Sequence, residues 1–255
     1  MSLQRLIAPI QRTLGFSFSF LIYYGLPFHH RALTEIYAPF IRPGDLCFDL
    51  GAHLGDRVRA WSKLKARVIA LEPNPASMSW LRRFYGNREN ITLLEQAIGA
   101  RAGKADFWIS RLTPSISTLS HQWLTTVQES ARFSGAHWDE QIIVTVTTLD
   151  ALIQQYGKPA FCKIDVEGAE LEVLQGLSQA IPALSFEYIP AAIETAVGCI
   201  DRLSQLGNYE YNWRVSEFPR LRSRHWRRPD DMKAQLQQMP RDGNSGDVYA
   251  RLISN

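Results

Sequence analysis

Short apolar segments alternate with longer amphipathic segments along most of the chain. The apolar segments predict buried strands at residues 46–50, 67–71, 91–95, 160–165 and 183–188. The segments between them predict helices at about residues 55–64, 75–85, 148–156, 168–176 and 191–206. Strand–helix units joined by short loops are typical of an α/β fold with a mostly parallel sheet and helices on both faces.

Two regions depart from this alternation. Residues 96–147 contain two expected strands, at 105–110 and 142–147, joined by a polar stretch rich in Ser and Thr that predicts a loop or lid. After the last long helix, residues 209–215 and 247–252 predict two closing strands without a long helix between them. We expect these two strands to form an antiparallel pair at one edge of the sheet.

The first 35 residues differ from the rest of the chain. Residues 14–28 are uncharged and aromatic, but they are too short to span a bilayer and lack a small-residue cleavage site. We expect residues 1–35 to form a helical, aromatic extension on a domain that covers residues 36–255. Contact of this extension with a membrane surface or an apolar partner is left open.

Composition places the protein among ordinary globular proteins. The 255 residues are 45% hydrophobic and 21% charged, which excludes disorder as the dominant state. Cys47, Cys162 and Cys199 make an odd number, and two of them lie in apolar runs. A disulfide framework is therefore not expected, and a reducing, cytoplasmic location is favoured.

Charge is nearly balanced overall but is unevenly distributed. The net charge of +3 is too small to indicate nucleic-acid binding. Six arginines lie between Arg214 and Arg228, where Glu217 is the one acid. This segment is either a solvated basic loop or a recognition element for an anionic acceptor, with Trp226 available to stack on a sugar.

Carboxylates occur at or near the ends of five expected strands, namely Asp49, Glu72, Glu95, Asp165 and Glu187. Ligands of open α/β sheets bind beyond the carboxyl ends of the strands. Five acids in such positions are more than a solvated surface requires. The sequence therefore predicts a ligand site along this edge.

The turn after the first strand discriminates between nucleotide-like ligands. A dinucleotide fingerprint that begins at Gly51 would require glycines where His53 and Asp56 stand. S-adenosylmethionine (SAM) fits better, because it has an ammonium that Asp49 can bind, a carboxylate that the following helix N-terminus favours, and no phosphate. Glu72 is expected to accept hydrogen bonds from both ribose hydroxyls.

Three motifs resemble the FkbM-type family of SAM-dependent methyltransferases. They are PGD and FDLGAHLG at residues 43–45 and 48–55, EPNP at 72–75 and KIDVEGAE at 163–170. The resemblance covers about residues 36–190, and His53 replaces the asparagine usual in the family. It implies the class I, Rossmann-like methyltransferase fold with a seven-stranded sheet. It also implies O-methylation of a hydroxyl on a sugar or natural product.

The same comparison suggests roles for individual residues. Asp49, Gly51, His53, Gly55 and Glu72 are expected to hold SAM, with Gln96 and Ala97 beside its adenine. Asp165 and Glu167 are the expected catalytic residues, because methyl transfer requires an aligned acceptor oxygen that loses its proton. Glu170 and Lys163 are weaker candidates, and His53, His121, His137 and His225 remain alternative bases. No metal site is expected.

Three kinds of function remain open at this point. The leading one is a small-molecule or glycan O-methyltransferase. A methyltransferase acting on nitrogen or on a protein side chain would have the same SAM-binding half. The third is a protein of this fold that binds SAM without catalysis, which the acids at Asp49, Glu72 and Asp165 disfavour.

Overall fold

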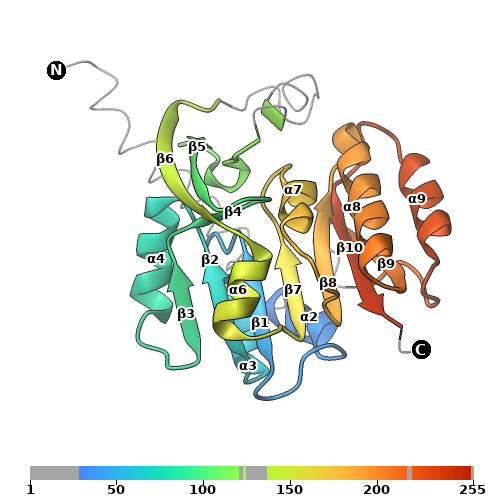
Figure 1. Cartoon of the computed structure of the whole chain (residues 1–255), viewed down its shortest axis with the longest axis horizontal. Coiled ribbons are helices and arrows are strands. Elements are labelled where there is room, and N and C mark those ends of the chain that lie inside the picture. Colours follow the sequence, from blue (N-terminus) through green and yellow to red (C-terminus); the bar gives the residue numbers. More distant parts are fainter. Residues whose placement is uncertain (1–28, 121–122, 125–136, 217–219, 254–255) are drawn as a thin grey trace.

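The computed structural model describes residues 29–120, 123–124, 137–216 and 220–253. Its centre is a seven-stranded sheet with the strand order β3-β2-β1-β7-β8-β10-β9 (Figure 1). The strands are β1 (Leu46–Leu50), β2 (Arg67–Leu71), β3 (Ile91–Leu94), β7 (Phe161–Ile164), β8 (Ala183–Tyr188), β9 (Tyr209–Val215) and β10 (Gly246–Leu252). Most of the expected extension, residues 1–28, lies outside the described residues.

The sheet is mostly parallel, as the alternation of elements predicts. Strands β3, β2, β1, β7 and β8 run parallel to their neighbours. Strand β10 is antiparallel to both β8 and β9, between which it lies. This confirms the seven-stranded sheet with an antiparallel pair at one edge. It also places Asp247 beside Glu187 in the register, at the ligand-binding edge.

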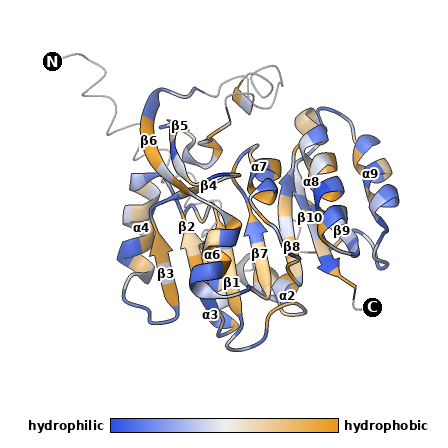
Figure 2. Cartoon of the chain, viewed as in Figure 1, coloured by the Kyte–Doolittle hydropathy of each residue, from blue (hydrophilic) through white to orange (hydrophobic). Residues whose placement is uncertain are grey.

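Helices cover both faces of the sheet because each strand buries alternate side chains on opposite sides. One apolar core packs α2 (His29–Tyr37), α3 (Asp56–Lys63) and α4 (Pro75–Tyr85) on the sheet. The other packs α6 (Leu149–Tyr156), α7 (Glu170–Gln175), α8 (Ile193–Leu206) and α9 (Pro229–Gln237) on the opposite face. Figure 2 shows the apolar strands and the mixed polar and apolar surfaces of these helices.

A second sheet of three strands, in the order β4-β6-β5, accounts for the interruption at residues 96–147. Strand β4 (Ala97–Ile98) pairs with β6 (Glu140–Thr147), which is antiparallel to β5 (Gly103–Ile109). The 3-10 turn η1 (Pro114–Ile116) follows β5. Two-residue β4 was missed because a run this short has no periodicity. Residues 121–122 and 125–136 of the expected loop or lid lie outside the described residues, and His121 with them.

The basic segment is a surface segment only in part. Arg214 belongs to β9 and is buried, so it is not part of a surface loop. Residues 222–227 run beside β9, where Arg222 N–H donates to Trp213 and Tyr211 bridges to Arg227. Trp226 packs on Phe40 in the protein. The guanidinium of Arg251 also lies over its ring, 4.2 Å from the ring centroid.

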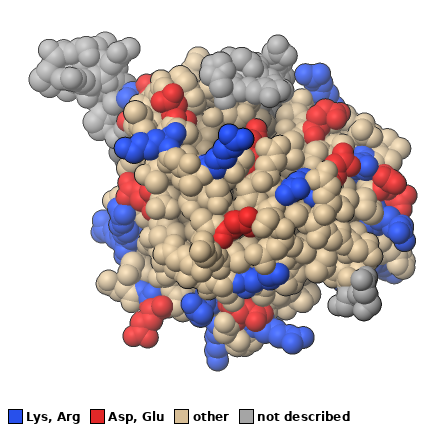
Figure 3. All heavy atoms as spheres, in the orientation of Figure 1, with Lys and Arg blue, Asp and Glu red and all other residues tan. Residues whose placement is uncertain are grey.

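Helix α9 was also missed, because the arginines before it made the whole stretch resemble a loop. Its own signals are ordinary: Pro229 occupies the first turn, and Asp230 and Asp231 follow there. None of the helices within the described ranges combines the length and apolar character needed to cross a bilayer. On the face shown in Figure 3, basic and acidic side chains are interspersed over the surface.

Candidate functional site

The turn after β1 is held against the end of β7. Gly51 has a φ of 84°, and a Cβ atom there would lie 1.8 Å from the carbonyl oxygen of Asp165. Only glycine therefore fits this position. Gly55, also in the left-handed region, begins α3, and its carbonyl accepts a hydrogen bond from Tyr85. Gly51 thus lets the turn after β1 lie against the end of β7, and Gly55 lets the same turn pack on α4.

Asp49 lies beneath this turn, fully buried on β1. Among the described residues, neither of its carboxylate oxygens has a hydrogen-bond partner. Burial raises the pKa of Asp49 to about 7, with neighbouring Asp56 and Asp165 adding to the effect and Arg57 opposing it. A buried carboxylate of this kind is suited to a cationic ligand group.

Glu72 follows β2 and connects two turns through its carboxylate. One oxygen accepts the backbone N–H of His53 and the other that of Asn74, both at 2.8 Å. Burial raises the pKa of Glu72 to about 7, although these two hydrogen bonds lower it. Each oxygen retains a lone pair, so Glu72 can also accept hydrogen bonds from ligand hydroxyls.

His53 stands where the family resemblance leads one to expect asparagine. Its φ of 46° explains the substitution, since Asn and His both occur in this left-handed region more often than most residues. Burial lowers the pKa of His53 to about 4, so the imidazole is neutral at neutral pH. A neutral ring does not repel a cationic ligand.

A hollow of about 510 Å³, a volume that includes space open to solvent, lies above these turns. Seven of the nine expected site residues line it: Gly51, His53, Glu72, Gln96, Ala97, Asp165 and Glu167. Asp49 and Gly55 do not line it: Asp49 is fully buried on β1, and a Cβ atom on Gly55 would lie 2.8 Å from the side chains of Leu81 and Tyr85. The far wall comes from the chain around the second sheet and includes Phe107, Ser117 and Leu119, which sequence analysis did not single out.

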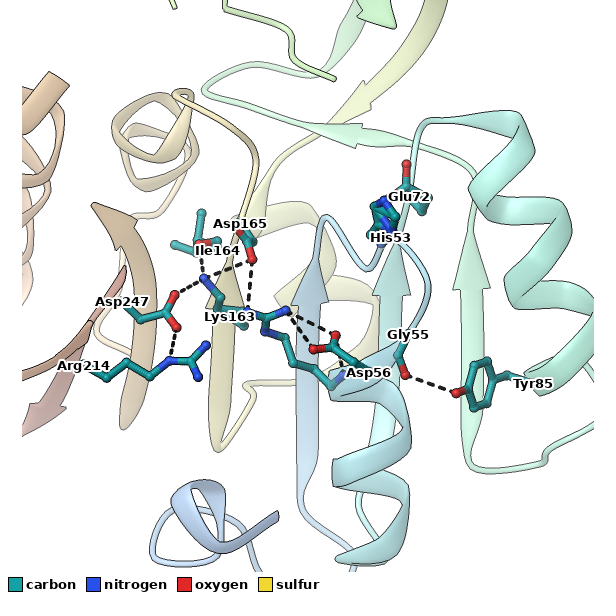
Figure 4. Close-up of polar contacts among 11 residues, drawn as sticks. His53, Gly55, Asp56, Glu72, Tyr85, Lys163, Ile164, Asp165, Arg214 and Asp247 are labelled. Atoms are coloured by element: carbon teal, nitrogen blue, oxygen red, sulfur yellow. Dashed lines mark hydrogen bonds and ion pairs between the residues drawn. The ribbon is translucent and has the colours of Figure 1, made fainter. Parts of the chain in front are cut away.

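Asp165, at the end of β7, is held by two cations. Its Oδ2 atom lies 3.3 Å from Arg57 Nη2 and 3.3 Å from Lys163 Nζ (Figure 4). Lys163 is fully buried and also contacts Asp247, as the expectation of a lysine beneath the site allowed. Arg57 was missed, because a charged residue in the first turn of a helix carries no signal of a partner on another strand.

Further acids surround Asp165. The carboxylate oxygens of Asp165, Glu167 and Glu187 lie within 4.8 Å of one another, a spacing that could hold a metal ion although sequence analysis expected none. Burial, and then these neighbouring acids, raise the pKa of Glu187 well above its usual range. Glu170 instead caps the local turn, accepting the N–H groups of Val166 and Gly168 at 3.2 Å.

Two other sequence candidates lie away from this cluster. Glu95 follows β3 but forms a 2.7 Å ion pair with Arg82 on α4 and is exposed. Glu95, unlike Glu72 and Asp165, does not line the hollow. His137 and His225 are exposed and do not line the hollow.

The chain matches a known protein family. The model of the Methyltransferase FkbM domain matches residues 49–201, more than half of the chain. The chain belongs to the FkbM methyltransferase family. The seven-stranded sheet of this methyltransferase is the class I methyltransferase fold, and its methyl donor is SAM.

Two curated relatives are similar to this methyltransferase. The 2-O-methyltransferase NoeI of Sinorhizobium fredii is 26% identical over 165 residues, which cover 62% of this chain and 67% of NoeI. The hexuronic acid methyltransferase AglP of Haloferax volcanii is 26% identical over 144 residues, covering 56% of this chain and 54% of AglP. The matched region thus spans about two thirds and about half of these relatives.

Solved structures show similar architectures. A TehB-like SAM-dependent methyltransferase from Corynebacterium glutamicum aligns with a TM-score of 0.48 and 7% identity over 96% of this chain and 99% of that chain. Precorrin-6y C5,15-methyltransferase from Geobacter metallireducens aligns with a TM-score of 0.46 and 12% identity over 88% of this chain and 86% of that chain.

The residues present fit SAM. The buried carboxylate of Asp49, which has no hydrogen-bond partner in the described part of the chain, suits the ammonium, and Glu72 keeps lone pairs for ribose hydroxyls at the rim of the hollow. Gln96 and Ala97 border the same hollow on the side of β4, where adenine is expected. Neutral His53 adds no positive charge near the sulfonium.

Proposed function

We propose that this methyltransferase transfers the methyl group of SAM to a hydroxyl oxygen of a sugar in a glycan. The observation that carries the proposal is that Asp165 and Glu167 line the same hollow as Glu72 and Gln96. The carboxylates expected to face the acceptor therefore lie beside the residues expected to hold SAM. Two relatives with sugar-related names, a 2-O-methyltransferase and a hexuronic acid methyltransferase, support the acceptor class.

The chain's own residues have few tasks in this reaction. SAM supplies a methyl group on its sulfonium; the acceptor oxygen attacks the methyl carbon in line, and the sulfur leaves as the neutral thioether of S-adenosylhomocysteine. Asp165 accepts a hydrogen bond from the acceptor hydroxyl and aligns it, and Glu167 lies beside it to take up the proton. In the transfer the acceptor O–H bond breaks, an O–CH₃ bond forms and the C–S bond breaks. The proton stays on a carboxylate.

We further propose that the acceptor is anionic. A hexuronic acid carries a carboxylate, and the exposed side chains of Arg220, Arg222 and Arg224 lie in the segment that follows β9. Arg222 acts electrostatically on Tyr188 at the end of β8, lowering a pKa that burial raises. Arginine favours carboxylates because its fork offers two parallel donors.

The test is methyl transfer from labelled SAM to a matched panel of acceptors. The panel contains methyl glucoside, methyl glucuronoside, an amino sugar and a lysine peptide, with mass spectrometry to locate the methyl group. We expect an O-methyl product, with the glucuronoside preferred over the glucoside. N-methylation of the amine or the peptide would contradict the proposal, as would SAM binding without turnover of any acceptor.

The assignment of Glu72 to the ribose has a test of its own. Glu72→Gln keeps the size of the side chain but replaces one acceptor oxygen by a donor. We expect SAM affinity, measured by calorimetry, to fall about 5- to 150-fold, the equivalent of about 1–3 kcal/mol for unpaired polar groups. Glu89→Gln, an exposed change remote from the hollow, is the control. Unchanged affinity in Glu72→Gln would refute the assignment.

A further inference from the structure

A line of six alternating charges passes beneath the site. Asp56 contacts Arg57, which contacts Asp165; Lys163 contacts both Asp165 and Asp247; and Arg214 contacts Asp247 (Figure 4). These residues come from α3, the end of β7, β9 and β10. The line therefore connects the SAM-side helix with the antiparallel edge of the sheet through Asp165.

Most of this charge line is removed from water. The side chain of Lys163 is 0% exposed, that of Arg214 is 2% and that of Asp247 is 4%. Buried ion pairs bring little net stability, because the cost of removing charges from water offsets their attraction. Apolar side chains in place of these charges could hold β7, β10 and β9 in the sheet equally well. Stability alone therefore does not account for the arrangement.

Asp165 is the member of the line that reaches the hollow, with 18% of its side chain exposed. Both cations contact the same oxygen, Oδ2, and they approach it from different elements, α3 and β7. A carboxylate fixed through one oxygen by two cations has a defined orientation. Its second oxygen is then available to a ligand.

We propose that Lys163, supported by Asp247 and Arg214, is a positioning residue for methyl transfer. Together with Arg57 it holds Asp165 so that the other oxygen of Asp165 accepts the hydrogen bond of the acceptor hydroxyl. This inference rests on the proposed function, in which Asp165 aligns the acceptor. Arg57, which follows Asp56 at the start of α3, extends the same support to the SAM side.

A merely structural role for Lys163, neutralising buried Asp247, makes a different prediction. Lys163→Met alone removes the cation that Asp165 and Asp247 share, and we expect it to lower the unfolding temperature. The double variant Lys163→Met with Asp247→Asn removes one charge of each sign, and the new amide can still accept from Arg214. A structural role predicts that the double variant regains both stability and activity. A positioning role predicts that it regains stability alone.

The kinetic experiment compares the wild type with these variants using SAM and methyl glucuronoside. For the double variant we expect kcat to fall about 10²-fold, the effect of a misplacement of roughly 1 Å, while SAM affinity stays within twofold. Lys233→Met, which breaks the exposed pair with Asp201, is the matched control and should change neither. A double variant with wild-type kcat would overturn the proposal.

A second variant and a second measurement keep the test decisive. Arg57→Gln removes the other cation from Asp165 at a partly exposed position, and we expect the same loss of kcat. Crystal structures of the wild type and the double variant with SAM give a readout without turnover: the carboxylate of Asp165 should shift or rotate, and an unchanged carboxylate refutes the inference. Wild-type enzyme that methylates no acceptor would instead refute the proposed function.

Discussion

Asp49 shows how a single buried group can make cofactor binding depend on pH. Its pKa is raised to about 7, mainly by burial, so a large share of the SAM-free protein carries a protonated Asp49 at neutral pH. The SAM ammonium favours the ionised form. We therefore expect the dissociation constant of SAM to rise as the pH falls through 7, by up to about tenfold per unit. Calorimetry in buffers of different ionisation enthalpy should also detect proton release on binding. Asp49→Asn should weaken binding and reduce the released proton count; an unchanged proton count would contradict this account.

At the scale of elements, the contact between the turn after β1 and the end of β7 determines how the two halves of the site fit together. Gly51→Ala would place a methyl group 1.8 Å from a backbone carbonyl oxygen, in addition to the strain of a positive φ. Gly44→Ala has the same kind of φ, 89°, but meets nothing within 4 Å, so it isolates the backbone strain. We expect Gly44→Ala to cost about 1 kcal/mol of unfolding free energy and Gly51→Ala considerably more, with loss of SAM binding. Denaturant unfolding measures both; equal costs would mean that the turn can move away from β7.

For the whole molecule, the hollow joins the main sheet to the chain around the second sheet, since Glu72 and Phe107 line the same space. A ligand bound there should stabilise both parts together. SAM at 100 times its dissociation constant is expected to add about 2.7 kcal/mol, which raises the melting temperature by roughly 5–10 °C at about 2–4 °C per kcal/mol. Scanning calorimetry should show one transition that moves as a unit. Two separate transitions, of which SAM shifts one, would show that the second sheet unfolds independently.

Local patterns predicted the parts of this protein that depend on neighbouring residues. The apolar run before Asp49, the glycine turn and the proline at the start of α4 each predict their own structure. Contacts set by strand order escaped prediction. Lys163 meets Asp247, 84 residues away, because β10 inserts between β8 and β9, and no periodicity in either strand encodes that order. The arginines of β9 and the following segment were mispredicted for the same reason. Arg214 differs from its exposed neighbours because it pairs with Asp247, and nothing in its local sequence indicates that pairing.

The segment between β3 and α6, which forms one wall of the hollow, has a consequence for how such enzymes diversify. Thr118, in this segment, donates a hydrogen bond to the carbonyl of Glu167. This wall is therefore attached to the turn after β7 although the two share no strand. Insertions, deletions or substitutions in this segment can therefore change the shape of the acceptor site while the turn after β1 and the charges beneath Asp165 stay in place. Variation in acceptor choice can accumulate there over generations without a new catalytic apparatus, and a library randomised in residues 110–119 is the natural starting point for redirecting this enzyme to other acceptors.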